Sequence, residues 1–295
     1  MDKSKASTRL FVFSILVIGG LTLGSLASVI PAFIQGLSME SIQEDPGSLL
    51  EKLNAGSLRL SLFINHLFLF LLPSVIYGLY IFQKDFFQGL DLNKKPAILS
   101  ISFGLLLILF AYPLVTLAHY INSILPLADW MIQAEQDVSA TLKKILEGNN
   151  SFMILINILL IALTPAIGEE LVFRAILQKN IAKIFKNGHV GVWIAAILFS
   201  LIHFQFEGFL ARMMLGAIMG YGYYFTRNLW VPITMHFVNN FIPVIAFMVA
   251  GEDLTDTSQL ENGVEWWTIL VSILGVPALI YIYKKYNGGK ETVRT

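Results

Sequence analysis

Three short motifs place ionisable side chains inside long apolar stretches of this sequence. The motifs are GEELVFR, FSLIH and HFVNN, and their candidate site residues are Glu169, Glu170, Arg174, His203, His236 and Asn240. A charged group in the middle of a membrane-spanning helix costs roughly 2.5–3.5 kcal/mol even on the gentler insertion scale, so such groups indicate function by default. We therefore take these six residues as the candidate catalytic site.

These residue types suit the activation of a water molecule. Glu169 and His203 could together take a proton from water. His236 and Asn240 could donate hydrogen bonds to the oxyanion that forms when water attacks a carbonyl group. Alternatively, one divalent metal ion, most suitably zinc, could be bound by Glu169, His203 and His236, as two histidines and a carboxylate do in open catalytic sites. A metal-free site stays open as well.

Spacing along a helix assigns these side chains to faces. Glu170 and Arg174 are four residues apart and share a face, so they can pair. Glu169 points about 100° away from Glu170, because a helix has 3.6 residues per turn. The pattern predicts one structural carboxylate neutralised by arginine and one free carboxylate. Phe199 and His203 are also four apart, so the ring can shield the imidazole.

Eight apolar stretches must position these residues. Hydrophobic residues make up 56% of the 295 and charged residues 14%, against roughly 45–50% and 25% in soluble domains. Most stretches have the roughly 20 residues that a helix needs to cross a bilayer. They lie near residues 10–33, 59–82, 97–119, 154–178, 189–206, 208–226, 229–250 and 265–284. We expect an all-α membrane protein with about eight transmembrane helices, of which the fifth and sixth could instead form a re-entrant hairpin.

The loops between these stretches alternate in charge. Lysine and arginine concentrate at the N-terminus, in every second loop and in the tail, as at Lys94, Lys95 and Arg227, whereas the other loops are acidic or balanced, as at Glu252 and Asp253. Cytoplasmic loops carry the excess of Lys and Arg. We therefore predict a multi-pass protein of the plasma membrane with both termini in the cytoplasm.

The same pass predicts four regions. They are three N-terminal transmembrane helices in 1–120, an extracytoplasmic insert in 121–150, a catalytic core of four helices in 151–250, and an acidic loop, last helix and basic tail in 251–295. Within the insert, Ala128 to Leu146 is predicted to form an amphipathic helix. In the sixth stretch, Gly216 and Gly220 form a small-xxx-small pair, which indicates close helix packing.

The three motifs resemble the signature motifs EExxxR, FxxxH and HxxxN of the CPBP family of intramembrane proteases. This family, whose name stands for CAAX protease and bacteriocin-processing and which is also called ABI, includes the Ras-converting CAAX endopeptidases. The likeness covers roughly residues 155–250, in the family's motif order. It implies a catalytic cavity between the fourth, fifth and seventh helices.

The resemblance also implies a role for each residue. Glu169 would be the catalytic base and His203 its partner. His236 and Asn240 would be the oxyanion or metal-binding pair. Glu170 and Arg174 would support the first motif. His66, His119 and His189 match no motif, and we predict structural or solvated roles for all three.

The predicted function is an intramembrane endopeptidase that hydrolyses a peptide bond of a membrane-associated or CAAX-like substrate. The alternative is a non-proteolytic membrane carrier or bacteriocin-immunity scaffold, because transporters also place acids and histidines at mid-depth. Pro165, just before Glu169, favours the carrier because transporters use broken helices; Asn240 beside His236 favours the protease. We expect a peptide or membrane-protein substrate and a lipid bilayer as partners. The 20 basic and 20 acidic residues balance, which argues against nucleic acid, and nothing in the sequence indicates an oligomeric state.

Overall fold

The structure is a computed structural model that describes residues 3–44, 49–147, 150–250 and 265–286, and the regular secondary structure within these ranges is helical throughout. The α-helices are α1 (Lys3–Ala27), α2 (Ile30–Gln35), α3 (Met39–Glu44), α4 (Leu49–Lys52), α5 (Ala55–His66), α6 (Leu72–Phe82), α7 (Phe86–Gly89), α8 (Ile98–Ser123), α9 (Asp129–Leu146), α10 (Ser151–Asn157), α11 (Thr164–Glu170), α12 (Lys179–Phe185), α13 (Gly188–Leu201), α14 (Phe209–Thr226), α15 (Trp230–Ala250) and α16 (Trp266–Tyr286). Shorter helical segments join some of them: π-helical Leu67–Leu71, Ile158–Leu163 and Leu171–Gln178, and 3₁₀-helical Gln83–Asp85.

The helices confirm an all-α membrane protein. Within the described residues, six helices are long and apolar enough to cross a membrane, judged by length and composition: Lys3–Gln35, Ala55–Gly89, Ile98–Ser123, Ser151–Phe185, Trp230–Phe247 and Trp266–Tyr286. The other two predicted stretches correspond to α13, an apolar helix shorter than these six, and α14. The count of eight spans, the four regions and the cytoplasmic termini stay predictions. The predicted acidic loop at 251–264 and the end of the basic tail lie outside the described residues.

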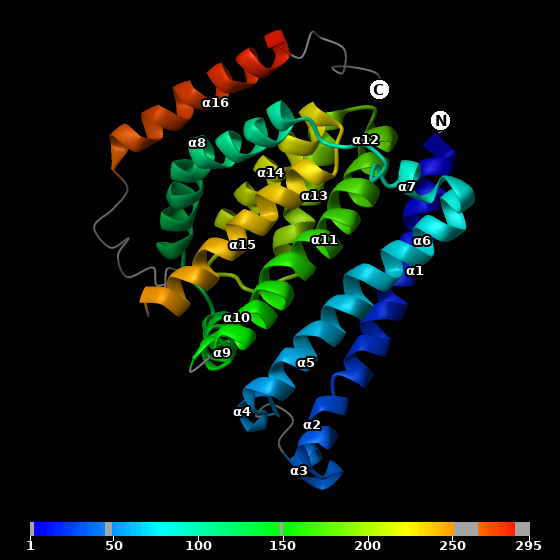
Figure 1. Ribbon diagram of the computed structural model, residues 1–295, viewed down its shortest axis with the longest axis vertical. Coiled ribbons are helices and arrows are strands. Elements are labelled where there is room, and N and C mark those ends of the chain that lie inside the picture. The colour runs from blue at the N-terminus through cyan, green and yellow to red at the C-terminus, as the bar shows by residue number, and fades with distance from the viewer. Residues whose placement is uncertain (1–2, 45–48, 148–149, 251–264, 287–295) are drawn as a thin grey trace.

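The helices form two groups that differ in their place along the chain (Figure 1). The N-terminal group, in blue and cyan, consists of α1 running beside α5 and α6. The green and yellow helices α10–α15 form the second group, and α8 and α16 cover its other side. The two groups meet where α1 packs against α12 and where the segment Leu67–Leu71 packs against α11. The candidate site lies at this second contact.

The fourth predicted span is one helix that passes through Pro165. It runs over Ser151–Phe185 and includes two of the π-helical segments. Proline at the start of α11 follows the π-helical segment Ile158–Leu163, and Thr164 Oγ1 donates to Leu159 O at 2.7 Å. Short π-helical stretches within α-helices occur frequently at functional sites. The helix thus changes from α-helical to π-helical winding before Glu169 but is continuous there.

Helices α13 and α14 pack closely through the two predicted glycines. A Cβ atom added at Gly216 would lie 3.1 Å from Phe199 Cδ1 and 3.2 Å from Ala196 Cα. One added at Gly220 would lie 3.0 Å from Val192 Cγ1. The small-xxx-small prediction is therefore confirmed, and the close approach leaves the Gly216 carbonyl within reach of side chains of the fourth span. The predicted amphipathic helix of the insert is also confirmed, as α9.

Candidate active site

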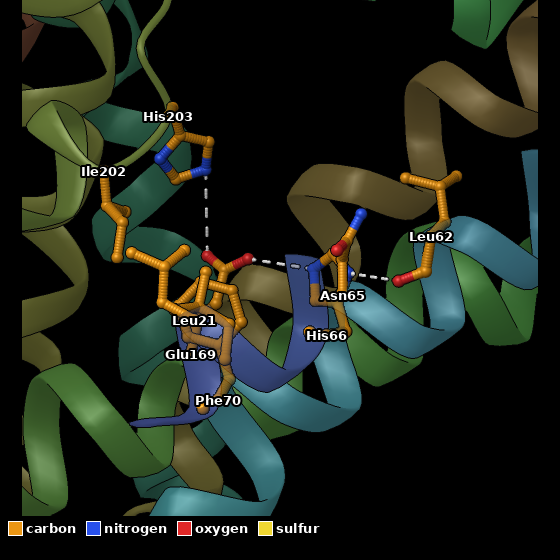
Figure 2. Close-up of a pocket in the computed structure, with 11 residues that line it drawn as sticks. Leu21, Leu62, Asn65, His66, Phe70, Glu169, Ile202 and His203 are labelled. Atoms are coloured by element: carbon orange, nitrogen blue, oxygen red, sulfur yellow. Dashed lines mark hydrogen bonds and ion pairs between the residues drawn. The ribbon is translucent and has the colours of Figure 1, made fainter. Parts of the chain in front are cut away.

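Glu169 lies at the centre of the site and is the penultimate residue of α11. Three imidazoles from three other parts of the chain approach its buried carboxylate: His66 Nε2 lies 3.3 Å from Oε1, and His203 Nε2 and His236 Nε2 each lie 3.9 Å from Oε2. Figure 2 shows Glu169 between His203 and His66. The predicted residues Glu169, His203 and His236 therefore meet, although their motifs are far apart in the sequence.

Two of these imidazoles are anchored through Nδ1. His203 Nδ1 lies 2.7 Å from the carbonyl of Phe199, one turn earlier, and the two rings are 5.1 Å apart. His236 Nδ1 lies 2.9 Å from Glu170 Oε1. A carbonyl or carboxylate oxygen only accepts, so Nδ1 is the donor in both rings, and each neutral imidazole then has its acceptor lone pair on Nε2.

Three acceptor atoms consequently converge on one small region. They are Glu169 Oε2 and the Nε2 atoms of His203 and His236, and Glu169 Oε2 has no hydrogen-bond partner among the described residues. A group of acceptors with these spacings suits a hydrogen-bond donor such as a water molecule, which can bridge atoms too far apart for a direct bond. The arrangement can therefore hold a water against the carboxylate that would deprotonate it.

Glu170 faces away from this region and pairs with arginine. Arg174 Nη1 donates to Glu170 Oε1 at 2.7 Å, with the side chains 1% and 0% exposed. Arg174 Nη2 donates to the carbonyl of Gly216 at 2.8 Å, and its guanidinium lies 5.1 Å from the ring centre of Phe199. The predicted ion pair is confirmed. Because Glu170 also accepts from His236, the pair fixes that imidazole, a link that the motif spacing did not indicate.

Asn240 lies one turn beyond His236 on α15, as predicted, but its amide makes other contacts. Its Nδ2 donates to the carbonyl of Ile161 at 3.4 Å, and its Oδ1 accepts from Asn239 Nδ2 at 3.2 Å. Neither Asn240 nor His236 lines the cavity that the described residues form beside Glu169. The oxyanion role of this pair stays a prediction.

The cavity beside Glu169 has a volume of about 320 Å³. It is lined by Gly20, Leu21, Gly24, Leu62, Asn65, His66, Leu69, Phe70, Glu169, Ile202 and His203. The predicted cavity lay between the fourth, fifth and seventh spans. Instead, the first and second spans form most of the wall, and the seventh span contributes no lining residue in the described part of the chain. The reason is that α15 packs behind Glu169, where His236 contacts its carboxylate.

His66 is the residue of this site that sequence reasoning missed. It ends α5, just before the π-helical segment Leu67–Leu71, and it lines the cavity with Nε2 against Glu169. The prediction of a structural or solvated role overlooked this position. An imidazole inside an apolar span was the available signal, and it was set aside because His66 belongs to no motif.

The turn that carries His203 is held by helices outside the motifs. Phe204 takes a φ of 52°, in the left-handed region. Asn122, near the end of α8, donates to the carbonyl of Phe206 at 2.9 Å, and Gln205 donates to Glu135 of α9 at 2.9 Å. Trp130 of α9 packs edge-on against Phe206, with ring centres 5.2 Å apart. The insert therefore contributes to the position of His203.

The described residues include no set of three His, Cys, Asp or Glu side chains arranged to hold a metal ion. Zinc about 2.0–2.2 Å from each ligand, in tetrahedral geometry, needs donor atoms about 3.4 Å apart. The nitrogens of His203 and His236 each lie 3.9 Å from Glu169 Oε2. The predicted ligands therefore lie further apart than tetrahedral zinc requires, and the zinc site stays a prediction.

Comparisons with known proteins agree with the motifs. Residues 151–242 match the family model described as type II CAAX prenyl endopeptidase Rce1-like. The uncharacterized protein YpbD of Bacillus subtilis (strain 168) is 35% identical over 86 residues, which cover 28% of this chain and 41% of that protein. The chain thus matches less than half the length of this relative. No solved structure matches the chain. Residues 151–242, which hold all three motifs, are thus similar to type II CAAX prenyl endopeptidases of the Rce1-like family, and the resemblance drawn from those motifs is confirmed.

Proposed function

We propose that this protein is an intramembrane endopeptidase whose base is Glu169. The observation that carries the proposal is the convergence of Glu169 Oε2 with the Nε2 atoms of His203 and His236 beside an apolar cavity. The substrate would be a peptide that reaches this cavity from the membrane, either a CAAX-like sequence or another membrane-associated chain. The match of residues 151–242 to the Rce1-like family model supports the reaction class.

The proposed reaction begins with a water molecule held by these three acceptors. Glu169 takes one proton from the water. The oxygen of the water then forms a bond to the carbonyl carbon of the substrate, and the carbonyl oxygen becomes an oxyanion. Asn240 is the proposed donor that stabilises this oxyanion, whereas His236, which donates from Nδ1 to Glu170, serves as an acceptor for the water. When the intermediate collapses, the C–N bond breaks and the leaving amine takes the proton that Glu169 holds. The products are a carboxylic acid and an amine.

The supporting side chains keep this geometry constant in the proposal. His203 is held by the Phe199 carbonyl, and His236 by Glu170, which is itself held by Arg174. Such anchoring matters because a misplacement of about 1 Å can cost about 100-fold in rate. Pro165 favoured the carrier alternative because it could break the helix, and the continuous helix over Ser151–Phe185 removes that one point in its favour.

The test compares membranes that contain the wild-type protein, Glu169→Gln or His189→Gln, at matched amounts of folded protein. New peptide termini are mapped by mass spectrometry. Loss of a general base costs about 10²- to 10⁴-fold, so Glu169→Gln should lose the wild-type termini. His189→Gln is the control, because His189, at the start of α13, contacts Tyr221 of α14 and does not line the cavity.

Each outcome has a defined meaning. If no terminus depends on Glu169, the protease proposal is wrong, and an altered transport or bacteriocin-resistance phenotype in the same variant would support the carrier. The proposed step uses protein side chains alone, so cleavage should persist after treatment with a chelator. Loss of cleavage on chelation would instead support one divalent ion, with zinc first among candidates, at Glu169, His203 and His236.

A further inference from the structure

His66 and His203 approach the same carboxylate from two sides but act on it differently (Figure 2). His66 Nδ1 lies 3.2 Å from the carbonyl of Leu62, four residues earlier, and His203 Nδ1 lies 2.7 Å from the carbonyl of Phe199, also four residues earlier. Both rings present Nε2 to Glu169. The His66 ring lies between two acceptor oxygens, Leu62 O and Glu169 Oε1, so both of its nitrogens donate, whereas Nε2 of His203 is an acceptor. They take different oxygens, because His66 contacts Oε1 at 3.3 Å and His203 faces Oε2 at 3.9 Å.

The position of His66 is itself fixed by packing. Its ring lies 5.4 Å from that of Phe70, and α1 presses against the following turn, where a Cβ atom at Gly20 would overlap the carbonyl of Phe68. Arg59, on the same helix, donates to Asn157 Oδ1 at 2.8 Å and so ties α5 to the helix that carries Glu169. These contacts limit the movement of His66 relative to Glu169.

Fixing Oε1 determines what Oε2 can do. The last torsion of a glutamate side chain is broad, with two nearly equivalent orientations. A partner on Oε1 removes this freedom and leaves Oε2 facing His203 and His236, where the water is proposed to bind. The groups around this carboxylate are the three imidazoles, from α5, from the turn after α13 and from α15, while α1 contributes glycines.

We propose that His66 is a positioning residue for the hydrolysis: it holds Glu169 Oε1 so that Oε2 is directed at the water. This inference rests on the proposed function, because it assigns His66 a part in the same reaction. His66 lies outside residues 151–242, so the family match assigns it no role. Its side chain, 18% exposed, reaches the cavity and is not sealed into a packed core.

The experiment measures cleavage of a synthetic peptide that spans a Glu169-dependent terminus, in proteoliposomes. His66→Phe keeps an aromatic ring against Phe70 and removes the nitrogen. We expect kcat to fall about 10- to 100-fold, while KM stays within about threefold, because orientation and not binding is lost. His66→Gln places an amide donor near the position of Nε2, and it should restore kcat to within about fivefold of the wild type.

A purely structural role gives a different pattern. His66→Phe and His66→Gln would then lower the amount of folded protein together and leave kcat per folded molecule unchanged, which would overturn the inference. If His66→Phe does not fold, His66→Met replaces it. Failure of the inference is distinct from failure of the proposed function, because in the first case Glu169→Gln still abolishes cleavage.

A second measurement does not depend on activity. An apolar carbodiimide labels carboxyl groups in membrane proteins, and mass spectrometry locates the label at Glu169. Freed from its partner on Oε1, Glu169 should be labelled several times faster in His66→Phe than in the wild type or in His66→Gln, with His189→Gln as the control. Equal labelling in all four proteins would contradict the positioning role.

Discussion

Glu169 and Glu170 are neighbours in the sequence, yet their carboxylates lie in opposite surroundings. Glu169 borders the cavity and meets three imidazoles, at 3.3 to 3.9 Å. Glu170 faces the interior of the core and pairs with Arg174 at 2.7 Å. Histidine can gain or lose a proton near neutral pH, whereas arginine stays charged. The chain thus surrounds one carboxylate with groups able to exchange protons and the other with a permanent charge.

The comparison separates chemistry from architecture on two faces of one helix. His236 connects the two faces, since its Nδ1 meets Glu170 and its Nε2 meets Glu169. The fixed charge on the core side therefore orients an imidazole on the cavity side. Changes on the core side should act first on folding, and changes on the cavity side on activity alone.

The largest effect on stability is expected from Arg174→Met. Removing one partner of a buried pair leaves the other charge uncompensated and costs about 3–5 kcal/mol of unfolding free energy. Unfolding of the purified protein in detergent, followed by circular dichroism, measures this. Lys143→Met is the control, because Lys143 and Glu147 form an exposed pair at 3.8 Å, which contributes little.

The double variant Glu170→Gln, Arg174→Met sharpens this prediction. With both charges removed, the double variant should be more stable than Arg174→Met alone. If it is no more stable, the two side chains are not energetically coupled, and the contrast between the two carboxylates fails on the core side.

A medium effect is expected from Gly216→Ala. The added methyl group would meet Phe199 and Ala196 at 3.1–3.2 Å, and overpacking of this kind costs about 1–3 kcal/mol. Gly19→Ala is the matched control, since a Cβ there meets nothing within 4 Å. The same unfolding measurement distinguishes them. Equal stability of the two variants would show that α13 and α14 can move apart without a loss of stability. The packing on the Glu170 side would then not be rigid.

The smallest effect is expected from Glu135→Gln in α9. This change weakens the contacts of Glu135 with Gln205 and Arg212, which hold the turn after His203. A hydrogen bond contributes about 0.5–1.5 kcal/mol, so a small loss of stability with a larger relative loss of kcat is expected. Glu147→Gln is the control, because Glu147 is exposed and directly follows α9. Unchanged kcat in Glu135→Gln would show that the insert does not position His203.

Local spacing predicted the contacts that lie within one helix. The pair of Glu170 and Arg174, and the packing of Phe199 on His203, both follow from a separation of four residues. The helical stretches were equally predictable, because membrane-spanning helices need long apolar runs. The family was identified from the same motifs.

Contacts between helices could not be predicted in the same way. His66 and Glu169 are 103 residues apart, and His236 and Glu170 are 66 apart. Which face one helix turns to another depends on the packing of all its neighbours, and the spacing within either helix carries no information about it. The cavity was misplaced for this reason, because the motif-bearing helices pack against each other and leave the open side of Glu169 to α1 and α5.

The division of the cavity wall has a consequence for how proteins with the proposed chemistry could diversify. The residues proposed for bond cleavage lie within 151–242, while most of the wall that an incoming chain would touch comes from positions before residue 71. Apart from His66, substitutions in that early segment would alter the shape of the cavity without altering the residues proposed for bond cleavage. Exchange of the first two spans between relatives, with His66 retained, would therefore be a route by which selection, or a protein engineer, could direct the proposed chemistry to new peptide sequences.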